Sequence, residues 1–68
     1  MSSVAKIVEL VGCSDKSWED AVQVAVTRAS KTIRGIRGVD MVRCTAIVKN
    51  NQIIEYRADV KVSFGVED

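Results

Sequence analysis

The alternating pattern of residues 53–64 constrains the fold of this chain more than any other feature. Within this run every even position is apolar, and the odd positions from Glu55 to Ser63 are polar, a period that is typical of a strand with one buried face. A strand of this length spans about 40 Å, whereas the only helical segment, of about 18 residues, spans about 27 Å. Because one helix cannot cover such a sheet, the sequence predicts an oligomer.

The small size of the chain also predicts self-association. Its 68 residues form a single domain, 1–68, and a domain this short buries only about 60% of the surface that its unfolded form exposes. Cys13 and Cys44 lie far apart and the sequence contains no histidine. Neither a dense disulfide framework nor a zinc site can therefore supply the missing stability.

The composition excludes several kinds of partner. Charged residues make up 28% of the chain with a net charge of +1, so the electrostatic pattern of a nucleic-acid-binding protein is absent. The apolar stretch from Ile7 to Val11 is interrupted by Glu9 and is too short to span a membrane, and Met1-Ser2-Ser3 lacks the basic residues of an export signal. We expect a cytoplasmic protein that binds neither nucleic acid nor a membrane.

Propensity and spacing predict the order strand, helix, strand, strand. The first strand is Val4–Val11, a helix begins at Ser17 and ends at Gly35 or Gly38, and Val39–Val48 precedes the alternating run. Apolar residues recur on one helix face at spacings of three and four, at Trp18, Val22, Ala25, Val26, Ala29, Ile33 and Ile36. The prediction is an α+β fold, β-α-β-β, with a three-stranded antiparallel sheet packed on one helix.

The loop between the last two strands is predicted to contain three residues. A two-residue loop at Asn50 and Asn51 would place the apolar row that contains Cys44 beside the polar row that contains Arg57, so that neither face of the sheet would be uniformly apolar. A three-residue loop pairs the two even-numbered rows, and Asn51 tolerates the left-handed conformation that this loop needs. Cys44 and Tyr56 are then expected on one sheet face under the helix, with Cys44 in the core.

Catalytic chemistry is not indicated. Without histidine there is no ordinary Ser-His or Cys-His pair, and Cys13, beside Gly12, is expected to be an exposed loop thiol. Asp15, Glu19 and Asp20 offer oxygen ligands that suit calcium, but their spacing is not that of a calcium-binding loop. Carboxylates that compensate the helix dipole are the alternative interpretation.

One basic grouping follows the helix. It consists of Lys31, Arg34, Arg37 and Arg43. These side chains are suited to a phosphate or carboxylate brought by a ligand or another subunit. The alternative is a solvated helix end with salt bridges between subunits.

Four stretches together resemble the dodecin family. They are Ile7-Val8-Glu9-Leu10-Val11-Gly12 with Ser14, Ser17-Trp18-Glu19-Asp20-Ala21, Arg28-Ala29-Ser30-Lys31-Thr32-Ile33-Arg34, and Val60-Lys61-Val62-Ser63-Phe64. The resemblance covers nearly the whole chain and implies a subunit of a hollow spherical homododecamer. It also implies a binding or sequestering protein without enzymatic activity, because the best-known members bind flavins.

Two positions depart from the flavin-binding members. Gly38 stands where the family has a tryptophan that sandwiches the flavin ring, and Arg57 stands where it has a glutamine that hydrogen-bonds the ring. With Arg37, these are the flavin-site positions that the resemblance implies, for FMN or riboflavin, and the departures predict weakened or altered binding. One subgroup that lacks both residues is associated with calcium, so the alternative is a cation-binding or purely structural dodecin that uses acidic side chains at subunit junctions.

Overall fold

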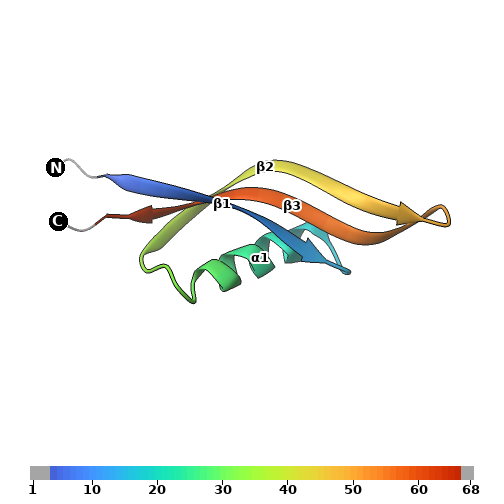
Figure 1. Cartoon of the computed structure of the whole chain (residues 1–68), viewed down its shortest axis with the longest axis horizontal. Coiled ribbons are helices and arrows are strands. Elements are labelled where there is room, and N and C mark those ends of the chain that lie inside the picture. The colour runs from blue at the N-terminus through green and yellow to red at the C-terminus, as the bar shows by residue number, and fades with distance from the viewer. Residues whose placement is uncertain (1–3, 67–68) are drawn as a thin grey trace.

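The computed structural model describes residues 4–66 and contains one helix and three strands within them. Strand β1 is Ala5–Ser14, helix α1 is Trp18–Ala29, and the long strands β2 and β3 are Ile36–Lys49 and Gln52–Gly65 (Figure 1). Residues 1–3, on which the expected lack of an export signal depends, lie outside the described part of the chain. The predicted β-α-β-β order is confirmed.

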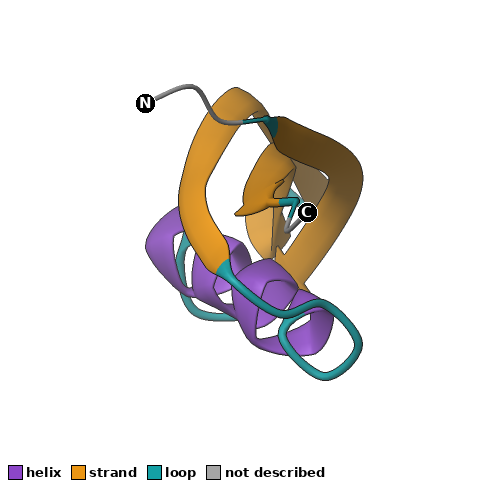
Figure 2. Ribbon diagram, turned by 90° about the vertical axis from the view of Figure 1, so that its left-hand side faces the viewer, coloured by secondary structure: helices purple, strands orange, loops and turns teal. Residues whose placement is uncertain are grey.

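The sheet has the strand order β1-β3-β2, so the last strand lies in the middle and pairs antiparallel with both neighbours. The helix lies against one face of this curved sheet and leaves the other face uncovered (Figure 2). It packs mainly on β1 and β3 and hardly touches β2. We call the two sides of the sheet the helix side and the open side.

The core forms where α1 approaches β1 and β3 through small side chains. Ala21, Ala25 and Ala58 are buried together with Val60 and Val62. A Cβ on Gly12 would lie 2.0 Å from the backbone oxygen of Ala21, so only glycine permits this close contact between strand and helix. Partly buried residues complete the core, namely Val8, Leu10, Val22, Val26 and Ile36.

The helix begins as predicted but is shorter than expected. Ser17 is its N-cap, and the hydroxyl accepts a hydrogen bond of 2.9 Å from the backbone N–H of Asp20. The regular helix ends at Ala29, well before Gly35 or Gly38. Gly35 has a φ of +74° in the loop that leads to β2, whereas Gly38 lies within β2. The prediction that one of these glycines ends the helix is therefore wrong, because the positive φ serves the loop instead.

The prediction of a three-residue hairpin loop is also wrong, although Cys44 and Tyr56 do lie on the same face of the sheet as that loop implied. Lys49 pairs with Gln52, which leaves the two-residue loop Asn50-Asn51 with φ angles of 53° and 62°. Positive φ at both central positions is typical of a type I′ turn. The pairing shifts by one residue between Ile47 and Val48. This β-bulge pairs even-numbered residues of β2 and β3, as in Cys44 with Ala58 and Ala46 with Tyr56, until the pairing shifts again between Met41 and Arg43.

Cys44 lies on the predicted side of the sheet but not in the core. It pairs with Ala58, and the next pair on the same face joins Ala46 to Tyr56. Cys44 is nevertheless exposed, because α1 hardly reaches β2. Cys13 is exposed as predicted, but it lies within β1 and not in a loop. The expectation for Cys44 failed because the helix covers two strands and not three.

Candidate functional site

Gly38 occupies an extended position on the open side of the sheet. It pairs with Ser63, and a Cβ on Gly38 would lie 3.2 Å from the Ser63 hydroxyl oxygen. That hydroxyl donates a hydrogen bond of 3.3 Å to the Gly38 carbonyl. A side chain at position 38 would therefore stand on the open face beside Ser63, without the strain of a positive φ.

Arg57 lies on the same face and is held by a neighbouring carboxylate. Its Nε donates a hydrogen bond of 2.6 Å to Oε2 of Glu55, two residues earlier in β3. This hydrogen bond and the negative charge of Glu55 raise the pKa of Arg57 above its ordinary value. Cys13 of β1 and Thr45 of β2 flank Arg57 in the ladder. The position thus presents a fixed cation, where a glutamine would present a neutral amide.

Within one chain, Gly38 and Arg57 are far apart. Gly38 pairs with Ser63, which lies six residues after Arg57 on β3, so about 20 Å of strand separates the two positions. A planar ligand the size of a flavin ring cannot contact both of them in a single subunit. The structure places them on one face but does not bring them together.

Arg37, the third residue of the predicted flavin site, points elsewhere. It is the extra residue of a β-bulge between Ile36 and Gly38 and has no partner on β3. Its guanidinium lies over Gly65, where a Cβ would be 2.5 Å from a terminal guanidinium nitrogen. Together with Arg34 and Gly35, these residues line a cavity of about 290 Å³ at the end of the sheet.

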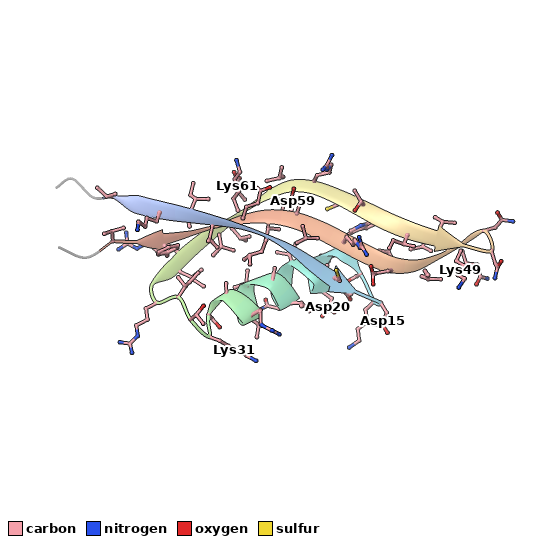
Figure 3. The ribbon with its side chains drawn as sticks, in the orientation of Figure 1. Asp15, Asp20, Lys31, Lys49, Asp59 and Lys61 are labelled. Atoms are coloured by element: carbon pink, nitrogen blue, oxygen red, sulfur yellow. The ribbon has the colours of Figure 1, made fainter. Side chains whose placement is uncertain are left out.

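The three acidic residues predicted as calcium ligands lie at the other end of the helix (Figure 3). Asp20 accepts a hydrogen bond of 2.6 Å from the Ser14 hydroxyl, whose oxygen also accepts one from the backbone N–H of Lys16. Within residues 4–66, no three acidic or other metal-binding side chains come together in one group. Asp20 therefore helps to hold the loop between β1 and α1 within this chain.

The sequence did not indicate a pair of carboxyl groups on the open side. Glu9 and Asp59 are diagonal neighbours, because Glu9 pairs with Lys61 and Asp59 pairs with Val11. The hydrogen bond to Asp59 and its negative charge raise the pKa of Glu9, while Lys61 and Arg43 partly oppose this shift. Oδ1 of Asp59 is buried without a partner in the described part of the chain. Only the β1-β3 register reveals this pair, which Figure 3 locates by Asp59 and Lys61.

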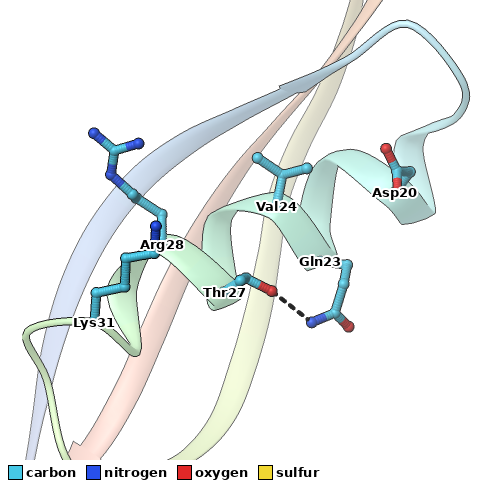
Figure 4. Close-up of a pocket in the computed structure, with 6 residues that line it drawn as sticks. All are labelled: Asp20, Gln23, Val24, Thr27, Arg28 and Lys31. Carbon is cyan, nitrogen blue, oxygen red and sulfur yellow. Dashed lines mark hydrogen bonds between the residues drawn. The ribbon is translucent and has the colours of Figure 1, made fainter.

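A larger, shallow cavity of about 360 Å³ runs along the outer face of α1 (Figure 4). Its lining includes Val24, and Gln23, which also lines it, donates a hydrogen bond of 3.0 Å to Thr27. None of the predicted flavin-site residues lines it. The helix that carries it cannot cross a membrane, and nowhere in residues 4–66 is there a helix long and apolar enough to do so.

The fold and the open face define a class of protein. A small β-α-β-β subunit presents an uncovered sheet face, and the positions of its candidate ligand site are too far apart to act within one copy. The dodecin family model matches residues 4–67, and the chain belongs to the dodecin family.

Known relatives agree with this assignment. A dodecin of Thermus thermophilus is 34% identical over 68 residues, with 100% of this chain and 99% of the relative covered. A calcium dodecin of Mycobacterium tuberculosis is 36% identical over 62 residues, with 91% and 87% covered. The structure of a dodecin from Streptomyces coelicolor superimposes with a TM-score of 0.92 at 27% identity, covering 97% of this chain and 94% of that one.

Proposed function

We propose that this chain is a non-enzymatic, cytoplasmic binding and sequestering protein that assembles as a hollow homododecamer with an altered flavin site. The observation that carries the proposal is the open face of the sheet. Gly38 and Arg57 share that face but are separated by about 20 Å of strand. A ligand that uses both positions has to lie between copies of the chain, so binding depends on assembly.

The side chains at these two positions support a weakened flavin site. Gly38 offers no ring, and an aromatic pair contributes about 0.5–1.5 kcal/mol beyond the area that it buries. Arg57 is held through Nε by Glu55 at 2.6 Å, and a guanidinium provides no acceptor for a ligand N–H. Both features support weaker flavin binding than in members that carry tryptophan and glutamine at these positions.

Replacing the two residues tests this function. Gly38→Trp with Arg57→Gln should strengthen riboflavin binding, and Gly38→Trp alone should give most of the gain, because it restores the stacking surface. Ser63, the nearest neighbour of the new Cβ at 3.2 Å, has a small side chain that can rotate away. Quenching of riboflavin fluorescence measures the affinity.

Gly38→Leu is the matched control, since it adds bulk without an aromatic face and should not strengthen binding. Light scattering on each variant should give the same assembly mass. Equal affinity of the wild type and the double variant would show that neither position matters and that other residues bind flavin.

A second candidate function is cation binding by carboxylates from more than one copy. The 36% identical relative from Mycobacterium tuberculosis is a calcium dodecin. In this chain, Asp59 has a buried oxygen without a partner in residues 4–66, next to Glu9. Oxygen ligands of this kind suit calcium.

Calcium titration by calorimetry distinguishes the two candidates. Glu9→Gln with Asp59→Asn tests the pair on the open side, and Asp15→Asn with Asp20→Asn tests the acidic residues near the helix. Loss of calcium binding in one of these variants would favour the second candidate. If calcium added to the wild type gives no heat beyond that of dilution, the second candidate function is excluded.

A further inference from the structure

We propose that Arg34, Gly35, Arg37 and Gly65 form a binding site for a phosphate group. The site lies at the end of the molecule where the loop after α1 enters β2, next to the end of β3 (Figure 1). It contains neither Gly38 nor Arg57. The proposal therefore does not depend on which ligand occupies the open face of the sheet.

The cavity has the size and the lining that a phosphate group requires. Its volume is about 290 Å³, and a water molecule takes up about 30 Å³ of liquid volume, so a phosphate with several waters fits. The lining consists of two arginines and two glycines. Each guanidinium is a planar fork of donors that matches phosphate oxygens in pairs.

The backbone directs Arg37 toward the cavity. The bulge between Ile36 and Gly38 removes Arg37 from the ladder, and bulges of this kind redirect a side chain. The guanidinium then lies where a side chain on residue 65 would otherwise stand. The loop is fixed as well, because the backbone N–H of Gly65 donates a hydrogen bond of 3.2 Å to the Gly35 carbonyl.

The charge of the cavity is not balanced within the described chain. Among residues 4–66, the ion pair between Arg57 and Glu55 is the only one, so Arg34 and Arg37 face the cavity without a carboxylate partner there. Two cations in one cavity repel each other, and a dianion relieves this repulsion. A phosphate satisfies both guanidinium groups, whereas a carboxylate carries half its charge.

Equilibrium dialysis of the assembled protein with labelled inorganic phosphate, at constant ionic strength, tests the site. Arg37→Gln should weaken binding about tenfold, the effect of losing one charge-assisted hydrogen-bonding group. Gly65→Ala should weaken it in the same direction without changing the net charge, because the new Cβ would lie 2.5 Å from the Arg37 guanidinium. Arg37→Lys, which keeps the charge but loses the planar fork, should fall between wild type and Arg37→Gln.

Lys49→Gln is the matched control. It removes one positive charge at the hairpin, at the other end of the molecule (Figure 3), and should leave phosphate binding unchanged. Competition with ribose 5-phosphate identifies the source of the phosphate group. If ribose 5-phosphate displaces the labelled phosphate at a lower concentration than unlabelled phosphate does, the ligand is a phosphorylated small molecule. If it needs an equal or higher concentration, the ligand is free phosphate.

Three outcomes would overturn the proposal. Competition by acetate as strong as that by phosphate would indicate a carboxylate site. Equal weakening of binding by Lys49→Gln and by Arg37→Gln would indicate diffuse electrostatics. The third is that wild type binds no phosphate while Arg37→Gln breaks the assembly, which assigns the arginines to contacts between subunits. Loss of phosphate binding leaves the riboflavin and calcium results unaffected, so failure here is distinguishable from failure of the proposed function.

Discussion

At the residue scale, the open face of the sheet is defined by charged side chains that are only partly paired. Arg57 has a partner in Glu55 at 2.6 Å. Glu9 and Asp59 instead place two carboxyl groups side by side, and Asp59 keeps one buried oxygen without a partner within residues 4–66. Two neighbouring carboxyl groups favour retention of one proton between them, because two adjacent negative charges repel each other. The face therefore combines an exposed ion pair with a site of electrostatic repulsion.

The first prediction concerns this repulsion and its dependence on pH. The pKa of Glu9 is raised above the ordinary value of 4.5 in the folded protein, so the folded state binds more protons than the unfolded state between that value and the raised pKa. Stability that is present below pH 4.5 is thus lost as pH rises through the folded pKa. Glu9→Gln should remove this loss, because the amide stays neutral and can donate to Asp59.

Chemical denaturation of wild type and Glu9→Gln from pH 4 to pH 8 measures the effect. The variant should gain stability relative to wild type as pH rises. Lys6→Gln, elsewhere on β1, is the control and should leave the pH profile unchanged. A wild-type profile that rises with pH in parallel with that of Glu9→Gln would contradict the assigned repulsion.

At the element scale, the hairpin of β2 and β3 combines a tight turn with bulges. The turn at Asn50-Asn51 has positive φ at both positions, and the shift between Ile47 and Val48 restores the pairing of the apolar rows. Another bulge directs Arg37 into its cavity. The same device thus sets the pairing of the strands at one end of the hairpin and forms a candidate site at the other.

The second prediction concerns the turn. Asn51→Ala should destabilise the protein by about 1 kcal/mol, because a residue with a Cβ and no local hydrogen bonding is strained at a φ of 62°. Asn51→Gly is the matched control and should be close to neutral, since asparagine followed by glycine is a preferred type I′ pair. Midpoints of denaturant unfolding measure both variants, and equal losses for alanine and glycine would argue against the type I′ turn.

At the scale of the whole molecule, the chain is more extended than a compact domain of its length. Its radius of gyration is 14.0 Å, whereas a compact domain of this length has about 11 Å. The helix covers β1 and β3 but hardly β2, and apolar side chains remain exposed, with Met41 at 65% and Val48 at 61%. Exposed apolar patches mark contacts with other molecules, and we expect these side chains to lie at contacts between copies of the chain.

The third prediction concerns assembly. Light scattering at micromolar concentration should give about 89 kDa, the mass of twelve chains of 7.4 kDa. Met41→Glu should shift the protein to smaller species, because burial of an unpaired charge at a subunit contact is unfavourable. A stable folded monomer of wild type would contradict the proposed shell.

The sequence by itself determined the order of the elements, the N-cap at Ser17 and the family, because period, capping and motif order are local properties of the chain. It did not determine the end of the helix or the turn between Asn50 and Asn51. Those features depended on the positive φ of Gly35 in the loop and on a β-bulge that the sequence pattern does not reveal.

The sequence identified candidate site residues by their chemical type, but it did not show which of them lie next to one another. The β-bulge takes Arg37 out of the ladder in which Gly38 pairs, and the β1-β3 register places Glu9 beside Asp59. Such pairings are decided by tertiary structure, since a shift of one residue in a ladder moves a side chain to the other face.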